Sequence, residues 1–197
     1  YTPNLLVLKE LTLKSCDEEH VPSILVLQKL ESLTFSDCSH WVSLPNSICE
    51  LTSLTQLNVQ SCHNLVSLPG DIGNLTLLTT LNLRECDNLS LPDSIGNCKS
   101  LTKLNIDRCT RLTLPDSIGE CKSLTSLCLE YNHSLVSLPP TFGDLKALQT
   151  LNLINCYNLE SLPISITQCE SLTSLKLSGC SYLESLPQWF GQRESLT

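Results

Sequence analysis

Leucine recurs along the chain in one pattern, L-x-x-L-x-L-x-x-C, which Leu54, Leu57, Val59 and Cys62 exemplify. The pattern returns every 22 to 24 residues, starting at Leu8, Leu30, Leu54, Leu78, Leu101, Leu124, Leu148 and Leu172, with Leu196 opening a ninth. A regular period of this length is typical of repeat proteins, in which each unit buries its apolar face only against its neighbours. We therefore number the units as repeats 1 to 8.

Within each repeat the alternation Leu-x-Leu predicts a short strand with one buried face, so that intervening polar residues such as Asn58 face outward. The second half of a repeat reads L-x-S-L-P-x-S-I-G, as in residues 65–73. We expect its proline to stop the strand, and we expect Asp93-Ser94 and Asp116-Ser117 to cap a short helical turn. The column of Gly73, Gly96, Gly119, Gly143 and Gly191 predicts a left-handed or closely packed backbone position.

These elements predict an α/β repeat fold in which successive coils stack into a solenoid. The solenoid would form a horseshoe arc with a parallel β-sheet on its concave side and short helical or 3-10 turns on its convex side. Residues 1–197 would form a single domain of about eight repeats. Leu5, Leu6 and Leu196 would be exposed at its ends, so we interpret the chain as truncated at both ends.

The extended pattern L-x-x-L-x-L-x-x-C-x-x-L-x-S-L-P-x-S-I-G covers nearly the whole chain and resembles the leucine-rich repeats of plant intracellular immune receptors, the nucleotide-binding leucine-rich-repeat class. The segments at residues 175–186 and 183–191 are close to that class in style. Similar repeats also occur in Ras-associated scaffolds, kinases and bacterial effectors, and the cysteine at the end of the pattern favours the plant class. The resemblance implies a ligand-sensing or autoinhibitory arm of a disease-resistance receptor in the cytoplasm.

Charge and hydropathy narrow the possible partners. The chain has 20 acidic and 12 basic residues, a formal charge of -8 and a pI near 4.9, which argues against nucleic acid or an anionic membrane as a partner. No apolar run approaches the roughly 18 residues of a membrane helix. Six basic and six acidic residues fall at outward strand positions, so the predicted concave face is neutral and suits a protein partner.

Twelve cysteines in 197 residues raise the question of disulfides. Seven of them occupy one column, Cys16, Cys38, Cys62, Cys86, Cys109, Cys156 and Cys180, with Asn132 in the same place in repeat 6. Adjacent members would be close enough for a disulfide, but their side chains would point the same way. Cys98, Cys121 and Cys169 replace core leucines. Buried free thiols in a reducing compartment explain this pattern better than disulfides do.

The sequence carries no catalytic or cofactor signature that we can identify. It lacks the G-x-S-x-G, Walker and G-x-G-x-x-G motifs, although a triad of scattered residues stays possible from sequence alone. No cysteine pair has zinc-ligand spacing, and His20, His40, His63 and His133 fall in expected loops. We therefore predict no enzyme activity, no cofactor and no metal.

Outward aromatic and aliphatic residues are scarce and gather in the later repeats. Tyr131, Ile154, Tyr157 and Tyr182 come from adjacent repeats, and Arg108, Arg111 and His133 would lie beside them. Tyrosine and arginine are favoured anchors of protein interfaces. We predict a protein-binding site on the concave face, formed by Tyr131, Ile154, Tyr157, Tyr182, Arg108, Arg111, His133, Arg84 and Glu130; the alternative is a set of scattered surface aromatics.

Two further outward features follow from the register. Asn58, Asn82, Asn105 and Asn152 form a column that Cys128 interrupts; it would be either a polar floor for a ligand or an amide ladder between strands. Cys128 is the one cysteine predicted on the open face, as a reactive thiol or an inert surface residue.

The leading hypothesis is a non-catalytic protein-binding module. Its partner would be a pathogen effector, a host protein or other domains of the same chain. The alternatives are a substrate-recruiting arm of a kinase or ubiquitin ligase, and a signalling scaffold or structural spacer.

Overall fold

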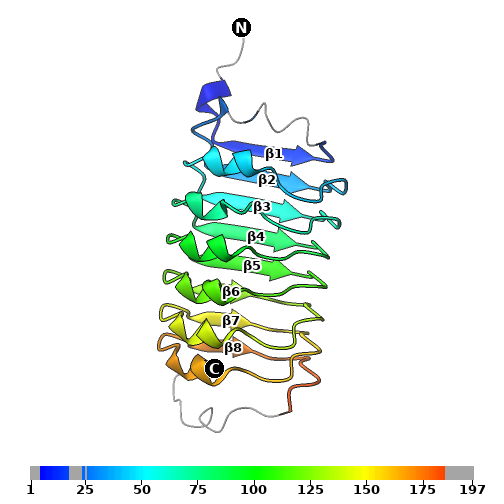
Figure 1. The fold of residues 1–197 in the computed structure, drawn as a ribbon, viewed down its shortest axis with the longest axis vertical. Coiled ribbons are helices and arrows are strands. Elements are labelled where there is room, and N and C mark those ends of the chain that lie inside the picture. Colours follow the sequence, from blue (N-terminus) through cyan, green and yellow to red (C-terminus); the bar gives the residue numbers. More distant parts are fainter. Residues whose placement is uncertain (1–4, 18–23, 25, 185–197) are drawn as a thin grey trace.

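The structure, a computed structural model, describes residues 5–17, 24 and 26–184. Its eight strands form one sheet, with every strand parallel to its neighbours and the strands in chain order (Figure 1). The strands are β1 (Glu10–Lys14), β2 (Ser32–Ser36), β3 (Gln56–Gln60), β4 (Thr80–Arg84), β5 (Lys103–Asp107), β6 (Ser126–Cys128), β7 (Thr150–Asn152) and β8 (Ser174–Lys176). The first five have five residues each and the last three have three.

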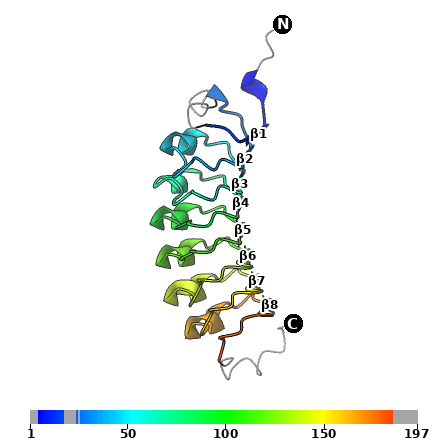
Figure 2. The same ribbon diagram turned by 90° about the vertical axis from the view of Figure 1, so that its right-hand side faces the viewer.

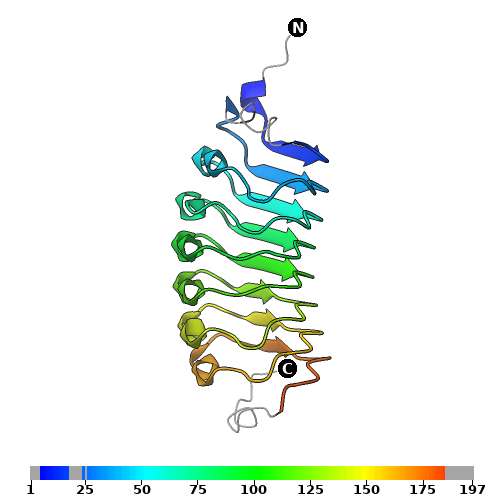
Figure 3. The same ribbon diagram turned by 45° about the vertical axis from the view of Figure 1, so that its right-hand side comes forward.

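Short 3-10 helices follow the strands and lie on the opposite side of the stack from the sheet, except for η1 (Leu5–Val7), which lies at the N-terminal end of the stack beside β1 (Figure 2). The others are η3 (Asn46–Glu50), η4 (Ile72–Asn74), η5 (Asp93–Asn97), η6 (Asp116–Glu120), η7 (Pro140–Asp144) and η8 (Ile164–Gln168). Figure 2 shows the sheet on the inner side of a gentle curve and the helices on the outer side, and Figure 3 shows each coil closing between them. The predicted solenoid, with its parallel sheet and convex 3-10 turns, is confirmed.

The strands pair in the register that the repeat predicts. Leu33, Leu57, Leu81 and Leu104 stand side by side across β2 to β5 and are fully buried. The residues between them are half-exposed on the open face. One layer of leucine and isoleucine therefore runs continuously from coil to coil, and each side chain buried in this way contributes about 1.5–3 kcal/mol.

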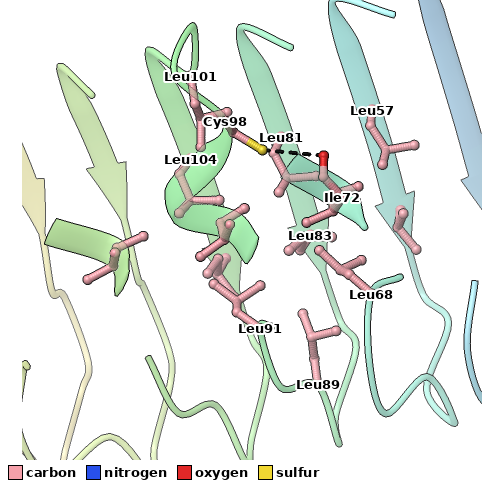
Figure 4. Packing of buried hydrophobic residues seen from close by; sticks show 14 of the residues in the cluster. Leu57, Leu68, Ile72, Leu81, Leu83, Leu89, Leu91, Cys98, Leu101 and Leu104 are labelled. Carbon is pink, nitrogen blue, oxygen red and sulfur yellow. Dashed lines mark hydrogen bonds between the residues drawn. The ribbon is translucent and has the colours of Figure 1, made fainter. Parts of the chain in front are cut away.

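Cysteines in the core take part in this packing. Figure 4 shows Cys98 among Ile72, Leu81, Leu101 and Leu104, with its thiol donating to the carbonyl oxygen of Ile72 at 3.5 Å. Cys121 and Cys169 are buried in the same way and donate to Ile95 and Phe142 carbonyl oxygens. All twelve cysteines are free thiols in the structure.

The column of Cys16 to Cys180 with Asn132, which we call the cysteine ladder, bonds a coil to the preceding one at Cys86, Cys109, Asn132, Cys156 and Cys180. The Cys156 thiol donates to the Leu129 carbonyl oxygen at 3.0 Å and Cys180 does the same to Leu153 at 3.1 Å. Asn132 is fully buried, and its amide both donates to the Ile106 carbonyl oxygen (2.7 Å) and accepts from the Cys109 backbone N–H (2.9 Å). The Asn132 amide thus takes the place of a thiol in the ladder, and its N–H and C=O groups form stronger hydrogen bonds than a thiol does.

Two local expectations were wrong. The prolines do not stop the strands: β3 ends at Gln60, nine positions before Pro69, and the prolines instead precede the 3-10 helices. Asp93-Ser94 and Asp116-Ser117 provide no side-chain cap, and the residue at each cap position is a proline. The serine hydroxyls are buried without a partner among the described residues. The fixed φ of proline starts the turn, so no side-chain acceptor is required.

The glycine column reflects close packing between coils. A Cβ on Gly143 would lie 2.2 Å from the Ser165 carbonyl oxygen, and a Cβ on Gly96 would lie 2.6 Å from that of Ser117. Of the two predicted explanations, the closely packed one is therefore correct for Gly73, Gly96, Gly119 and Gly143. Gly191 lies outside the described residues.

The left-handed position lies elsewhere, directly before the cysteine ladder. Ser15, Asp37, Ser61, Glu85, Arg108, Tyr131 and Asn155 have φ between 49° and 59°, and Gly179 follows in the same column at 81°. The N–H of Tyr131 donates to the Ile154 carbonyl oxygen of the next repeat at 2.9 Å, and Arg108 donates likewise to Glu130. This bonded turn directs the chain off the sheet in every coil, and it determines where two predicted site residues point.

Candidate functional site

The predicted aromatic residues lie in the segments that directly follow β6, β7 and β8. The guanidinium of Arg108 stands over the ring of Tyr131, 4.5 Å from its centroid. A cation–π contact at this distance is favourable and fixes both side chains in one arrangement. Both residues are in the left-handed column, which brings them side by side.

A second ring pair continues the same surface. The rings of His133 and Tyr157 are 4.7 Å apart between centroids and inclined by 39°. Tyr182 follows from repeat 8, where its backbone N–H donates to the Tyr157 carbonyl oxygen at 3.1 Å. Tyr157 and Tyr182 are 39% and 64% exposed, so large parts of both rings are free to contact a partner.

Ile154 adjoins the first pair through its backbone, since its carbonyl oxygen accepts a hydrogen bond from the Tyr131 N–H. We call Arg108, Tyr131, Ile154, His133, Tyr157 and Tyr182 the aromatic strip. Among the chain's tyrosine, tryptophan and phenylalanine residues, Trp41, Phe35 and Phe142 are buried in the core. Tyr1, Trp189 and Phe190 lie outside the described residues. The remaining three, Tyr131, Tyr157 and Tyr182, all belong to the strip.

The other three predicted site residues have different surroundings. Arg84 pairs with Asp107 and Glu85, each at 3.5 Å. Glu130 accepts a hydrogen bond from the Asn152 amide. Arg111 is exposed, and in the described part of the chain its one recorded bond runs from its backbone N–H to Asp87. Arg84 and Glu130 therefore belong to a polar network beside the strip, and Arg111 lies apart from it.

Asp107 is the centre of that polar network, and the sequence analysis did not select it. It lines a hollow of about 330 Å³ on the inner face, together with Asn82, Leu83, Arg84, Asn105 and Cys128. Burial raises the pKa of its carboxyl above the usual value, while Arg84 and Arg108 oppose the shift. One carboxylate oxygen, Oδ1, is buried with no partner in the described structure. Its place opposite Arg84 in the strand register was the available signal.

The asparagine column is an amide ladder over repeats 2 to 5. Asn58 donates to Thr34, Asn82 donates to Asn58 at 2.6 Å, and Asn105 donates to Asn82 at 2.7 Å. Asn152 does not continue the ladder, because its amide bonds to Glu130 instead. The ladder explanation is therefore confirmed for three of the four predicted asparagines and is wrong for Asn152.

Cys128 lies at the end of this ladder, half-buried in the sheet with its side chain on the open face. Burial raises the pKa of its thiol above the ordinary value of 9.0, with the nearby carboxylates of Glu130 and Asp107 adding to the shift. A thiol with a raised pKa is mostly protonated at neutral pH and is a poor nucleophile. The inert surface cysteine is thus the better description.

Two properties of the described residues bear on other kinds of site. Among residues 5–17, 24 and 26–184, no group of three or more His, Cys, Asp and Glu side chains is arranged to hold a metal ion. In the same part of the chain, no helix has the length and apolar character needed to cross a bilayer.

Comparison with known proteins agrees with this architecture. Residues 61–135 match the model of a leucine-rich repeat region, and residues 171–192 match that of a leucine-rich repeat. A search of curated proteins found no match. Among solved structures, the leucine-rich repeat domain of the type III effector XCV3220 (XopL) is similar, with 27% identity, a TM-score of 0.83 and coverage of 98% of this chain and 69% of that chain.

Two further solved structures share the fold at lower similarity. The leucine-rich repeat protein LIC12759 of Leptospira interrogans is 25% identical, with a TM-score of 0.52 and coverage of 98% of this chain and 61% of the other. The ectodomain of the Arabidopsis receptor kinase HAESA, in complex with an IDA peptide hormone, is 25% identical, with a TM-score of 0.56 and coverage of 86% and 32%. This chain therefore spans less than two thirds of either protein.

The repeats, the register and the matches together define a leucine-rich-repeat solenoid. Its fold is that of a protein-interaction module, a class that is generally non-catalytic. The similar structures come from a bacterial effector and from a plant receptor kinase, so the fold is shared by proteins of different classes.

Proposed function

We propose that this chain is the protein-recognition arm of a larger cytoplasmic plant immune receptor and that it binds its partner through the aromatic strip. The observation that carries the proposal is the pairing of Arg108 with Tyr131 and of His133 with Tyr157 on an otherwise polar sheet. Stacked contacts hold these side chains in place before binding, which lowers the entropy lost when a partner docks.

The surroundings of the strip favour a protein over a small molecule. The adjacent hollow is open to solvent, and Arg84, Asp107 and two asparagines line it beside Leu83 and Cys128. Such a mixture of an aromatic centre with a charged rim is typical of protein interfaces. The partner would be a pathogen effector, a host protein or another domain of the same chain, and the arm would either sense it or hold the receptor inactive.

The intracellular assignment rests on the twelve free thiols, many of them in the core. Burial raises the pKa of Cys62 to about 11 and of Cys156 to about 12, so both are held as neutral thiols. Neutral buried thiols persist where the compartment is reducing.

A second candidate function starts from the similarity to the repeat domain of a type III effector, which shows that the fold is not confined to receptors. On that alternative the arm recruits substrates to an enzymatic domain in the same protein, such as a kinase or ubiquitin ligase. The sequence beyond residues 1–197 decides between the two: a P-loop domain upstream supports the receptor, and a kinase or ligase domain supports recruitment.

Affinity capture from plant extract tests the binding proposal. The bait is the chain itself, beside a variant carrying Tyr131→Ala and Tyr157→Ala, with captured proteins identified by mass spectrometry. We expect a protein that the parent retains and the variant loses while both have the same circular dichroism spectrum. Capture of the same proteins by both baits would place binding elsewhere.

A further inference from the structure

A groove opens on the side of the solenoid, away from the inner face, between repeats 5 and 6. Its volume is about 390 Å³, within the range of ligand sites. Buried Leu112, Leu135 and Leu138 contribute to its floor, and exposed Thr113, Ser134, Val136 and Ser137 line its rim. We call it the side groove.

Elsewhere on this side, the backbone bonds one coil to the next. The N–H of Val66 donates to the Val42 carbonyl oxygen (2.7 Å), Ser90 donates to Val66 (2.8 Å), and Glu160 donates to Val136 (3.0 Å). Parallel bridges also join Ser43, Ser67, Ser90 and Thr113 in succession. In the described residues this series ends at Thr113, and no backbone hydrogen bond joins residues 112–114 to residues 134–138.

The difference has its origin in repeat length. The acceptor in each of the three bonds is a valine that lies four residues after the ladder position, namely Val42, Val66 or Val136. Repeats 4 and 5 are one residue shorter and lack it. Repeat 4 still bonds to repeat 5, through Arg111 N–H to the Asp87 carbonyl oxygen and the bridge from Ser90 to Thr113. Among the described residues, repeat 5 has neither connection to repeat 6 at this place.

We propose that the side groove binds an extended peptide segment of a partner protein, one with aliphatic side chains and a flanking basic residue. An interrupted ladder leaves main-chain donors and acceptors open at the edge of Thr113 and Ser137, which is the arrangement that an added strand completes. The leucines of the floor receive its aliphatic side chains.

Charge selects the flanking residue. Asp116 lines the groove, is exposed, and its carboxylate forms no ion pair within the described part of the chain. No lysine, arginine or histidine lines the groove. A carboxylate without a counter-ion beside an apolar floor favours a lysine or arginine at the end of the bound segment.

The chain itself indicates a suitable probe. Residues 65–69, Leu-Val-Ser-Leu-Pro, are the segment through which Ser67 pairs with Ser90. An acetylated, amidated peptide of this sequence with a lysine at each end should pair beside Thr113 in the same way. The matched probe carries glutamates at the ends. Binding of each to the protein is followed by NMR or fluorescence anisotropy.

We expect saturable binding of the lysine-flanked peptide, weakened about tenfold by deletion of Val136, since two lost backbone hydrogen bonds amount to roughly that factor. Deletion gives repeat 6 the length of repeats 4 and 5, which removes the mismatch. The substitution Asp116→Lys, at an exposed position, should make the glutamate-flanked peptide the better ligand. This second variant decides the question if the deletion prevents folding.

The proposal is independent of the aromatic strip, so the Tyr131→Ala, Tyr157→Ala variant should bind the peptide as the parent does. Loss of peptide binding in that variant would place the peptide on the inner face and overturn the proposal. Absence of saturable binding at millimolar peptide, unchanged binding by a folded deletion variant, or an unchanged order of the two peptides with Asp116→Lys would overturn it as well.

Discussion

The inner face of repeats 2 to 5 and that of repeats 6 to 8 share a backbone plan but differ in what their outward side chains do. In the first region, five-residue strands carry an amide ladder in which Asn58, Asn82 and Asn105 bond to one another. In the second region, three-residue strands carry Cys128, Asn152 and Lys176 at the equivalent place, and rings follow beyond their ends. Outward groups that satisfy one another have less to offer a partner.

Repeat 6 is where the two regions meet. It replaces the ladder cysteine by Asn132 and the outward asparagine by Cys128, and its segment between the ladder position and the proline is one residue longer than that of repeat 5 and contains Val136. Each change alters a contact with repeat 5. Asn132 forms a stronger buried bond in the core, and Cys128 cannot continue the amide bonds on the inner face. Among the described residues, the longer segment lacks the backbone bridge to repeat 5 at the side groove. Substitutions at repeat 6 therefore test the comparison directly.

The largest effect is expected at Asn132. Replacing it by alanine leaves the buried Cys109 N–H and the Ile106 carbonyl oxygen without their partner, at a cost of about 2–4 kcal/mol in the free energy of unfolding. Asn132→Cys is the matched control, with an expected cost of about 1 kcal/mol, because thiols take this role in the other repeats. Guanidinium unfolding followed by circular dichroism measures both. Equal losses in the two variants would mean that the amide has no special role.

On the outer side we expect no difference between the regions. A Cβ would meet a carbonyl oxygen of the next coil at Gly96 and at Gly143, so Gly96→Ala and Gly143→Ala should each cost about 1–3 kcal/mol. Gly70→Ala is the control, with no atom within 4 Å of its new Cβ and a change of less than about 1 kcal/mol expected. Denaturant midpoints report all three. A tolerated Gly143→Ala beside a disruptive Gly96→Ala would show that the coils stack more loosely in the second region.

Extending the amide ladder should sharpen the contrast on the inner face. Asn82→Ala breaks two amide bonds and should cost about 1–2 kcal/mol. Cys128→Asn adds an amide beside Asn105 and should raise the free energy of unfolding by up to about 1 kcal/mol. A Cys128→Ser variant controls for loss of the thiol. If asparagine and serine at this position give the same stability, the ladder does not extend by side-chain bonding.

The smallest effect concerns Asp107. Its pKa is raised in the folded chain mainly by burial, so folding favours the neutral carboxyl. Stability is therefore lost as the pH rises from the ordinary carboxyl pKa through the raised pKa of the folded chain. Asp107→Asn should remove this loss. We expect the loss to be about 0.5 kcal/mol or less, because Arg84 and Arg108 stabilise the charged carboxylate. Thermal unfolding of both proteins between about pH 3 and pH 6 provides the measurement. A parent that gains stability relative to the variant over this range would reverse the sign.

Most of the fold follows from the sequence because one period fixes both strand register and coil length. The buried role of Cys98 and the place of Asn132 in the ladder follow from position alone. The capping by Asp93 and Asp116 was wrong because proline in the preceding position already sets the turn. The left-handed column was missed because its members, from Ser15 to Asn155, share no residue type and no glycine appears before Gly179.

The candidate site was predictable in its membership and less so in its contacts. Counting outward rings located Tyr131 and Tyr157, since equivalent positions in adjacent repeats must be neighbours. It could not show that Glu130 would take the Asn152 amide out of the ladder or that Asp107 would be half-buried, because side-chain rotamers depend on neighbours in three dimensions. The side groove depended on a single missing residue, whose effect on the backbone has no periodic signal.

The central claim, that the aromatic strip is the binding surface, is tested most directly by the affinity of a captured partner for three purified proteins. These are the parent, the Tyr131→Ala, Tyr157→Ala variant, and a control with Ser36→Ala and Gln60→Ala on the inner face of repeats 2 and 3. Two anchors worth more than 1 kcal/mol each predict a weakening of about 30-fold or more for the tyrosine variant. The control should bind as the parent does. Equal affinity of all three, or a loss confined to the control, would contradict the account.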